Sequence, residues 1–423
     1  MKYDLIYRKE IMEILISYTD TTFIKAITGI RGSGKSSIMF MLMEYLRCHK
    51  NIEDNQIISI DFESIEYFDI KDIIAFIKLI TSKINKENKF YLFFDEIHEV
   101  NGWEKVVEGL RIDYDVDIYV TGSNANLLSS EFTTYISGRY VEIKVHPLSF
   151  KEFLLFYKSR ILKDEVLDIK NVFNYYIKYG GLPIIFNGSF KDNNIVMNNI
   201  KSVVSIIIEK SISSIYNALN ANIIRSLLKF LCEKIDVNFT INNISKAIRD
   251  YYIKNNTDTN DFIVTNNIIS DYIELLIDSY IFHSVNSFDI IEKEIIEINQ
   301  KYYIEDIGIR NSLISYEEDL NLNHIYENIV YNELLVRNYK VYFGKFNNHE
   351  IDFVALSCNR KIYIQFTKSL NEENAFKRVV APLLEIKDNY PKFIIVFDYY
   401  PMDTYEGIKI YNIIDFLLKE DWI

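Results

Sequence analysis

The chain has 423 residues, of which 49% are hydrophobic and 25% are charged, and its formal net charge is −13 at pH 7. This length predicts roughly two to four domains, and the large apolar fraction excludes general disorder. The negative charge argues against broad, nonspecific attraction to nucleic acid, although it does not exclude one local basic patch.

The N-terminal segment and the cysteines indicate a cytoplasmic protein. The N-terminus, MKYDLIYRKEIMEIL, carries acids instead of a signal-peptide pattern, and no apolar run approaches the roughly 20 residues of a membrane span. The cysteines Cys48, Cys232 and Cys358 are far apart, and the histidines are scattered, so neither a disulfide framework nor a common zinc site is indicated. We therefore expect no membrane partner.

Residues 1–160 alternate apolar runs with helical stretches. This alternation predicts right-handed βαβ units and a mainly parallel sheet. The candidate strands are FIKAITGI, QIISIDF, FYLFFDEI and DVDIYVTGS. Each is a short apolar run bounded by polar residues, as expected for a strand that is covered on both faces.

The rest of the chain predicts three further regions. Residues 161–233 resemble a helical lid or linker, interrupted by YGGLP. Residues 234–300 predict two helices, at 242–254 and about 265–280, followed by apolar strands as in a winged helix. Residues 301–423 return to strands, with a helix around 376–386. The candidate strands there are KVYFGKF, EIDFVAL, KIYIQFT and FIIVFDY. The chain is thus predicted to be an α/β multidomain protein.

The stretch GIRGSGKSS at residues 29–37 fits the P-loop pattern GxxxxGK[ST]. An apolar strand precedes it and a helical pattern follows it, so backbone N–H groups can point at phosphate oxygens at a helix N-terminus. Lys35 would reach the β- and γ-phosphates, and Ser36 would place its hydroxyl on Mg²⁺. Arg31 could contact a phosphate or pin the loop to a neighbouring acid. The predicted phosphate-binding residues are Gly29, Gly32, Ser33, Gly34, Lys35, Ser36 and Ser37.

Acidic and polar residues end the next predicted strands. Asp95 and Glu96 close FYLFFDEI, where the first can hold the Mg²⁺ shell and the second can orient a water. Two acids at the end of a buried strand are costly unless cations or hydrogen bonds compensate for them, so the pair supports a nucleotide site. Ser123 or Asn124 could lie beside the γ-phosphate. Arg139 could stabilise charge on the transferring phosphoryl group, or be a surface arginine.

Four runs follow the P-loop in order: DEIHEVNGWEKVVEGL, TGSNANLL, SGRY and HPLSFKEFL. They resemble prokaryotic AAA-like ATPases, related to the STAND group, that carry a C-terminal domain similar to restriction endonucleases. The resemblance extends through YGGLP, KYYIEDIGIRNSL, YENIVYNELL, HEIDFVAL and KIYIQFTKSL, and so covers most of the chain. It implies a P-loop NTPase core, a helical and winged-helix middle, a restriction-endonuclease-like end, and ATP and Mg²⁺ as cofactors.

The resemblance also implies roles by motif position. It assigns the Walker A role to residues 34–36 and the Walker B role to Asp95 and Glu96. Ser123 takes the sensor role. Arg139 lies in the GR motif of the family. Pro183 lies in the GxP motif, which packs near the adenine in related ATPases. No NKxD-like stretch that reads guanine follows the core, which favours ATP over GTP.

The last region predicts an incomplete metal site. A nuclease of this fold places an Asp on one strand and a Glu or Gln on the next, with a Lys two residues on. Asp352 and Gln365 match, and Glu327 on the preceding helix could be a further oxygen ligand. The residue two beyond Gln365 is Thr367, and Lys368 would point to the opposite face unless a bulge intervenes. A nuclease and a docking domain without the reaction both stay open.

The second helix predicted in the middle region, TNNIISDYIELLIDSY, carries no Lys or Arg. Its exposed acids would be repelled by a phosphate backbone, so we expect an interdomain role. Lys246, Arg249 and Lys254 on the preceding helix leave backbone contact open.

The sequence favours an ATP-hydrolysing switch in which the phosphate state changes how the P-loop core docks on the later domains. Two alternatives stay open: an ATP-gated, Mg²⁺-dependent nuclease acting on DNA or RNA, and a scaffold that nucleotide stabilises with little turnover. A protein partner is expected, and nucleic acid is not favoured by the charge. An oligomer, and an arginine finger supplied in trans, are compatible with the sequence.

Overall fold

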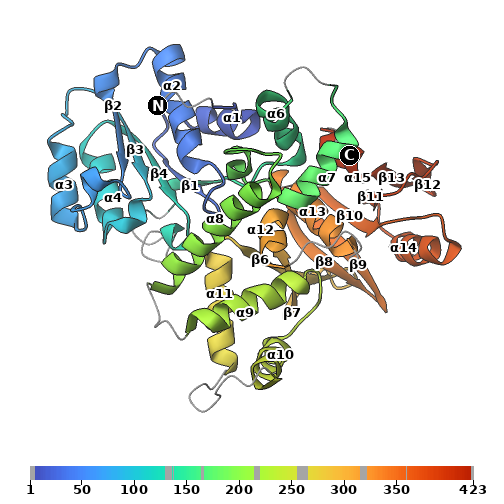
Figure 1. Cartoon of the computed structure of the whole chain (residues 1–423). Coiled ribbons are helices and arrows are strands. Elements are labelled where there is room, and N and C mark those ends of the chain that lie inside the picture. The colour runs from blue at the N-terminus through green and yellow to red at the C-terminus, as the bar shows by residue number, and fades with distance from the viewer. Residues whose placement is uncertain are drawn as a thin grey trace. The chain divides into compact units, whose positions relative to one another are not determined.

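The computed structural model describes residues 5–128, 136, 138–162, 166–213, 220–254, 265–314, 322–358 and 360–420. The chain divides into two compact units (Figure 1). The first comprises residues 1–147 with 278–280, and the second comprises residues 148–277 with 281–423. None of the described helices combines the length and the apolarity needed to cross a membrane.

The first unit is built on a five-stranded sheet in the order β2-β3-β4-β1-β5, and its described strand pairs are all parallel. The strands are β1 (Ile24–Thr28), β2 (Ile57–Asp61), β3 (Phe90–Asp95), β4 (Val116–Gly122) and β5 (Tyr140–Lys144). The helices are α1 (Lys9–Ser17), α2 (Lys35–Lys50), α3 (Ile73–Thr81) and α4 (Trp103–Asp113). Short 3₁₀ helices span Asp54–Gln56, Ile65–Tyr67, Ile97–Glu99 and Ala125–Leu128. The predicted parallel sheet and its strands β1 to β4 are confirmed.

Strand β3 shows why these strands are continuously apolar. Leu92 and Phe94 pack in the hydrophobic cluster on one face of the sheet, whereas Tyr91 and Phe93 pack in the cluster on the other face. Side chains alternate along a strand, so a strand buried on both faces needs apolar residues at every position. Because the strands are parallel, their carboxyl ends meet at one edge of the sheet.

A buried ion pair joins β1 and β4 near their amino ends. The side chains of Lys25 and Asp117 are 0% and 1% exposed, and the Lys25 ammonium contacts the Asp117 carboxylate. That carboxylate also accepts hydrogen bonds from the Tyr119 hydroxyl (3.0 Å) and the Asp20 backbone N–H (2.8 Å). Burial lowers the pKa of Lys25, and the Asp117 charge opposes this effect. The pair therefore compensates for charge inside the core.

The second unit contains an eight-stranded mixed sheet in the order β12-β13-β11-β10-β9-β8-β6-β7. Its strands are β6 (Phe282–Asp289), β7 (Glu294–Ile304), β8 (Lys340–Phe346), β9 (His349–Ser357), β10 (Arg360–Thr367), β11 (Lys392–Val396), β12 (Thr404–Tyr405) and β13 (Ile408–Asn412). The strands predicted from KVYFGKF, EIDFVAL, KIYIQFT and FIIVFDY are confirmed as β8 to β11.

Helices precede and flank this sheet. They are α6 (Phe150–Arg160), α7 (Ile169–Tyr179), α8 (Asn193–Ser213), α9 (Asn220–Glu233), α10 (Ile241–Lys254), α11 (Asn266–Asp278), α12 (Ile307–Leu313), α13 (Asn323–Val336), α14 (Glu373–Glu385) and α15 (Ile413–Leu418), with a 3₁₀ helix at Pro183–Phe186. The predicted helical character of residues 161–233 is confirmed for the described residues of that range.

The two helices predicted for a winged helix are confirmed as α10 and α11, and the hairpin of β6 and β7 follows them. However, β6 also pairs in parallel with β8, so the hairpin belongs to the eight-stranded sheet. Strand β7 continues through residue 300, where the sequence predicted the start of the last domain. The four-domain division, the winged helix and the restriction-endonuclease-like fold stay predictions, and the loop NNTDTND lies outside the described residues.

Two motifs distant in sequence, YGGLP and IEDIG, form one hydrogen-bonded structure in the second unit. Gly181 N–H donates to Asp306 Oδ2 (2.6 Å), and Asp306 Oδ1 caps α12 by accepting from Ile309 N–H (3.1 Å). A Cβ on Gly308 would lie 2.0 Å from the Tyr179 carbonyl oxygen, so only glycine permits this approach. Burial raises the pKa of Asp306 to about 6. The motifs therefore have a structural explanation inside this unit.

Candidate functional site

The glycine-rich loop after β1 has the backbone geometry of a phosphate-binding loop. Gly29, Gly32 and Gly34 have φ angles of 137°, 84° and 101°, which other residues rarely adopt. A Cβ on Gly29 would lie 2.2 Å from the Val145 carbonyl oxygen, so the loop is packed directly against the segment after β5. The loop leads into α2, which begins at Lys35.

The loop contains two hydroxyl groups suited to an anionic ligand. Ser33 Oγ is buried and has no hydrogen-bond partner among the described residues. Ser36, in the first turn of α2, is exposed. Buried polar atoms in folded proteins are normally satisfied, and a helix N-terminus favours negative charge, so both features fit a bound phosphate.

Lys35 lies inside the loop. Its Nζ donates to the carbonyl oxygens of Gly29 (2.9 Å) and Ile30 (3.2 Å). Burial lowers the pKa of Lys35, while the charges of Glu96 and Asp95 oppose this shift. The ammonium therefore sits among neutral carbonyls, where a phosphate oxygen would be a stronger partner.

Asp95, the last residue of β3, connects the loop to the neighbouring strand. Its carboxylate accepts hydrogen bonds from the hydroxyls of Thr121 on β4 and Ser36 on α2. Burial raises the pKa of Asp95. The structure thus brings together the two predicted Mg²⁺ ligands, Ser36 and Asp95, and oxygen ligands of this kind fit Mg²⁺.

Glu96 has a left-handed backbone (φ 49°), which is uncommon for a residue with a side chain. Its Oε2 accepts hydrogen bonds from the backbone N–H and the Oγ of Ser123, both at 3.1 Å. The Nδ1 atom of His98 lies 3.3 Å from the same oxygen. Ser123 therefore contacts Glu96, and its predicted role beside the γ-phosphate stays a prediction.

Two arginines differ in their distance from the loop. Ile24 N–H at the start of β1 bonds to the Arg139 carbonyl oxygen, so Arg139 lies at the end of the sheet opposite the loop. Its side chain, 55% exposed, pairs with Glu108 (2.7 Å), as a surface arginine would. Arg31 instead forms a bidentate pair with Glu63 (2.9 and 2.8 Å), which confirms that it pins the loop to a neighbouring acid.

The structure also reveals a residue that the sequence analysis missed. Arg8 is buried, and its Nη1 and Nη2 donate to the carbonyl oxygens of Ser33 and His146, both at 3.0 Å. It therefore clamps the P-loop to the segment after β5. Thr121, which links Asp95 and the Glu96 backbone N–H, was missed as well.

Replacing Arg8 with Gln is expected to weaken ATP binding about 10-fold, because hydrogen bonds to a charged group contribute about 1.5–3 kcal/mol. Titration with a fluorescent ATP analogue measures the Kd. Lys9→Gln is the matched control, because Lys9 is the exposed neighbour, and its Kd should stay unchanged. An unchanged Kd in Arg8→Gln would show that the clamp does not shape the loop.

The residues predicted for the nuclease-like metal site lie together in the second unit, but they already form hydrogen bonds within the protein. Gln365 Oε1 accepts from Asp352 N–H (3.2 Å), and its Nε2 donates to the Glu350 carbonyl oxygen (3.0 Å). Asp352 Oδ2 accepts from Phe366 N–H (2.6 Å). Glu327 Oε1 lies 2.8 Å from the Tyr303 hydroxyl. Within the described ranges, no group of three or more His, Cys, Asp or Glu side chains is arranged to hold a metal ion.

A bulge in β10 that could bring Lys368 to the side of Gln365 is not observed among the described pairs. The pairing of β10 with β9 and β11 shows no register shift over the described pairs. Lys368 follows the end of β10 and is exposed, whereas Gln365 is buried. This lysine therefore does not join Gln365.

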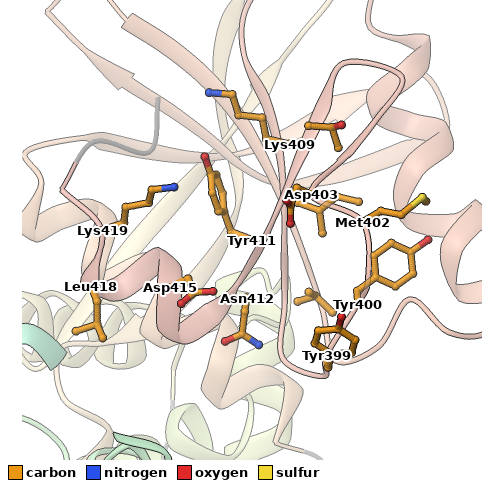
Figure 2. A pocket seen from close by; sticks show the side chains of 13 residues that line it. Tyr399, Tyr400, Met402, Asp403, Lys409, Tyr411, Asn412, Asp415, Leu418 and Lys419 are labelled. Atoms are coloured by element: carbon orange, nitrogen blue, oxygen red, sulfur yellow. The ribbon is translucent and has the colours of Figure 1, made fainter.

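Pro183, the predicted adenine contact, begins the 3₁₀ helix of the second unit. The same unit has a pocket of about 680 Å³ at the carboxyl ends of β11 and β13 (Figure 2). Tyr399, Tyr400 and Tyr411 line this pocket. Asn412 is already bonded to the Phe397 carbonyl oxygen (2.8 Å). None of the residues predicted from the sequence to form a site lines the pocket.

Comparisons with known proteins agree with the loop geometry. The model of the family described as "AAA domain" matches residues 21–154, and a "Domain of unknown function (DUF8612)" matches residues 170–320. An uncharacterized protein of Haemophilus influenzae is 34% identical over 416 residues, covering 98% of this chain and 99% of that protein. An uncharacterized protein of Methanocaldococcus jannaschii is 30% identical over 375 residues, covering 86% and 79%.

Solved structures are more distant. A Walker-type ATPase of Pyrococcus abyssi is 15% identical with a TM-score of 0.49, covering 74% of this chain and 97% of that one. The ORC2 protein of Aeropyrum pernix, in ADPNP-ADP complexes, is 10% identical with a TM-score of 0.43, covering 76% and 92%. These scores are too low to carry a functional argument.

The family match and the loop geometry together identify an AAA-type, nucleotide-binding P-loop domain in residues 21–154. The chain belongs to the same protein family as the Haemophilus influenzae protein, to which it is similar over nearly its whole length.

Proposed function

We propose that the protein is a Mg²⁺-dependent ATPase whose nucleotide state acts as a switch on its second unit. The AAA-domain match supports ATP binding. The observation that carries the proposal further is the convergence of Lys35, Asp95 and Glu96 at the carboxyl edge of the sheet. These are the groups that phosphoryl transfer needs: a cation for the phosphates, a ligand for the metal, and a carboxylate for the water.

In this proposal, the backbone N–H groups of the loop and Lys35 bind the β- and γ-phosphates. Ser36 and Asp95 would hold Mg²⁺, which would neutralise the negative charge of the phosphates when bound. Thr121 fixes the Asp95 carboxylate by its hydrogen bond, so the metal ligand is oriented before nucleotide binds.

Glu96 orients and deprotonates the attacking water. Ser123 holds Glu96 Oε2 with two hydrogen bonds, which leaves Oε1 for the water. When the γ-phosphate leaves, Lys35 loses an anionic partner and bonds again to the loop carbonyls. The nucleotide state thus changes the contacts of the loop.

The segment at residues 145–147 supports the proposed switch. The P-loop contacts it at Gly29 and Val145, and Arg8 bridges the loop to His146. This segment ends the first unit and leads into the second unit at Leu148. A change in the loop would therefore act on the chain just before the second unit begins.

Phosphate release from ATP with Mg²⁺ tests the proposal. We expect Lys35→Ala to lose turnover about 100-fold or more, since a group that stabilises transition-state charge contributes at least this much. Lys78→Ala, which changes an exposed lysine on α3, should retain turnover. Hydrogen exchange in residues 148–277 and 281–423 should differ between ATP and ADP in the wild type and in Lys78→Ala, but not in Lys35→Ala. An ATP-raised melting temperature without phosphate release would instead support a scaffold.

A further inference from the structure

One buried lysine of the second unit lies among carboxylates that the proposed ATPase does not use. We define the Lys301 cluster as Lys301, Asp236, Glu327, Glu350 and Asp352. Lys301 lies on β7 with a side chain 4% exposed, and its Nζ contacts Asp236 Oδ1 (2.6 Å) and Glu350 Oε1 (2.5 Å). The cluster therefore contains a cation that comes from the protein itself.

The carboxylates around Lys301 are fixed by further hydrogen bonds. The Tyr303 hydroxyl lies 3.0 Å from Asp236 Oδ1 and 2.8 Å from Glu327 Oε1. Tyr303 is two residues from Lys301 on β7, so both side chains point to the same face of the strand. His324 Nδ1 lies 3.3 Å from Asp236 Oδ2. The cluster is thus assembled from β7, β9, α13 and the residues before α10.

Burial and neighbouring charges shift the pKa values of three carboxyl groups in the Lys301 cluster. Burial raises the pKa of Glu327 well above its usual value and raises the pKa of Asp352 to about 7. Burial acts to raise the pKa of Asp236. Hydrogen bonds from His324 and Glu327, together with the Lys301 charge, outweigh burial and hold this pKa below its usual value.

We propose that the Lys301 ammonium is the resident cation of this site and fills the position that a divalent metal ion would take between Asp236 and Glu350. The two distances from Nζ, 2.6 and 2.5 Å, show that the ammonium lies in direct contact with both carboxylate oxygens, where a metal ion would have to bind. The site is thus complete without metal. A metal-dependent nuclease would need the position that Lys301 occupies. This inference does not depend on the proposed ATPase.

Thermal unfolding of the nucleotide-free full chain tests the inference, with Mn²⁺ and Ca²⁺ as probes. Lys301→Ala leaves the carboxylates without a cation and should lower the melting temperature by on the order of 10 °C. Millimolar Mn²⁺ or Ca²⁺ should recover about half of that loss, because the shortened side chain opens the cation position. Lys301→Met, which keeps the volume and removes the charge, should be destabilised and not rescued.

Lys361→Ala is the matched control. Lys361 is a partly buried lysine on β10 of the same sheet, and it pairs with the carboxylate of Asp388 (3.5 Å). This variant should lose stability without any rescue by metal. Equal rescue of Lys301→Ala and Lys361→Ala, or none for Lys301→Ala, would overturn the inference.

A measurement on the wild type decides the matter even if Lys301→Ala does not fold. Electron paramagnetic resonance should detect no Mn²⁺ bound at the Lys301 cluster. The amount of Mn²⁺ bound by the wild type should therefore equal the amount bound by Asp352→Asn. Bound Mn²⁺ that persists in Asp95→Asn but disappears in Asp352→Asn would show that the cluster takes a metal beside Lys301. Cleavage of plasmid DNA with Mn²⁺ that disappears in Asp352→Asn would overturn the inference in the same way.

Discussion

Glu96→Gln is expected to lower the turnover of ATP about 10²–10⁴-fold, because the proposed general base becomes an amide that cannot take a proton. ATP binding should stay within about twofold of the wild type. The amide oxygen of Gln can still accept the two hydrogen bonds that Ser123 donates to Glu96 Oε2, so the loop should keep its shape. Steady-state phosphate release measures kcat, and titration with a fluorescent ATP analogue measures binding.

Glu99→Gln is the matched control for this variant. Glu99 is a partly exposed acid three residues along the chain and lies 3.5 Å from Lys71. Its kcat should be close to that of the wild type. If Glu96→Gln retained wild-type turnover, another group would activate the water and the proposed role of Glu96 would be wrong.

Asp117→Ala should produce the largest loss of stability among the variants of the first unit, about 3–5 kcal/mol, because it leaves the buried Lys25 ammonium uncompensated. The Lys25 side chain is fully buried, so water cannot replace the lost partner. The free energy of unfolding, measured in urea, gives this difference. The double variant Lys25→Met/Asp117→Leu should be more stable than Asp117→Ala, because both buried charges are removed together.

Glu13→Ala supplies the control for a surface ion pair. Glu13 pairs with Lys9 on α1 at 3.8 Å, and both side chains are exposed. Exposed pairs contribute about 0–1 kcal/mol, so this variant should unfold at nearly the wild-type urea concentration. A loss below about 1 kcal/mol in Asp117→Ala would contradict the assigned importance of the buried pair.

The strands of the first unit could be predicted because burial on both faces leaves a continuous apolar run in the sequence. The exception is β5, whose sequence YVEIK alternates with polar residues and whose burial is partial. Because β5 was not predicted from the sequence, the position of Arg139 relative to the sheet could not be predicted either. Its position at the far end of the sheet follows from the pairing of β5 with β1, which no local pattern reveals.

The P-loop and the two acids at the end of β3 were predicted because their chemistry requires fixed spacing. Arg8 was missed because its partners are backbone carbonyls, 25 and 138 residues away, which leave no signal in side-chain patterns. In the second unit, the spacing of Asp352 and Gln365 correctly placed them together. The same spacing could not reveal Lys301, because this residue enters the cluster from β7, a strand outside the motif.

The central claim is that the P-loop hydrolyses ATP. A single-turnover experiment tests it most directly, since protein in excess over γ-labelled ATP makes slow product release irrelevant. We predict that the wild type with Mg²⁺ converts the bound ATP to ADP and phosphate, and that EDTA or Lys35→Ala prevents the conversion. Recovery of intact ATP from the wild type after prolonged incubation with Mg²⁺, with binding verified in the same sample, would contradict the claim.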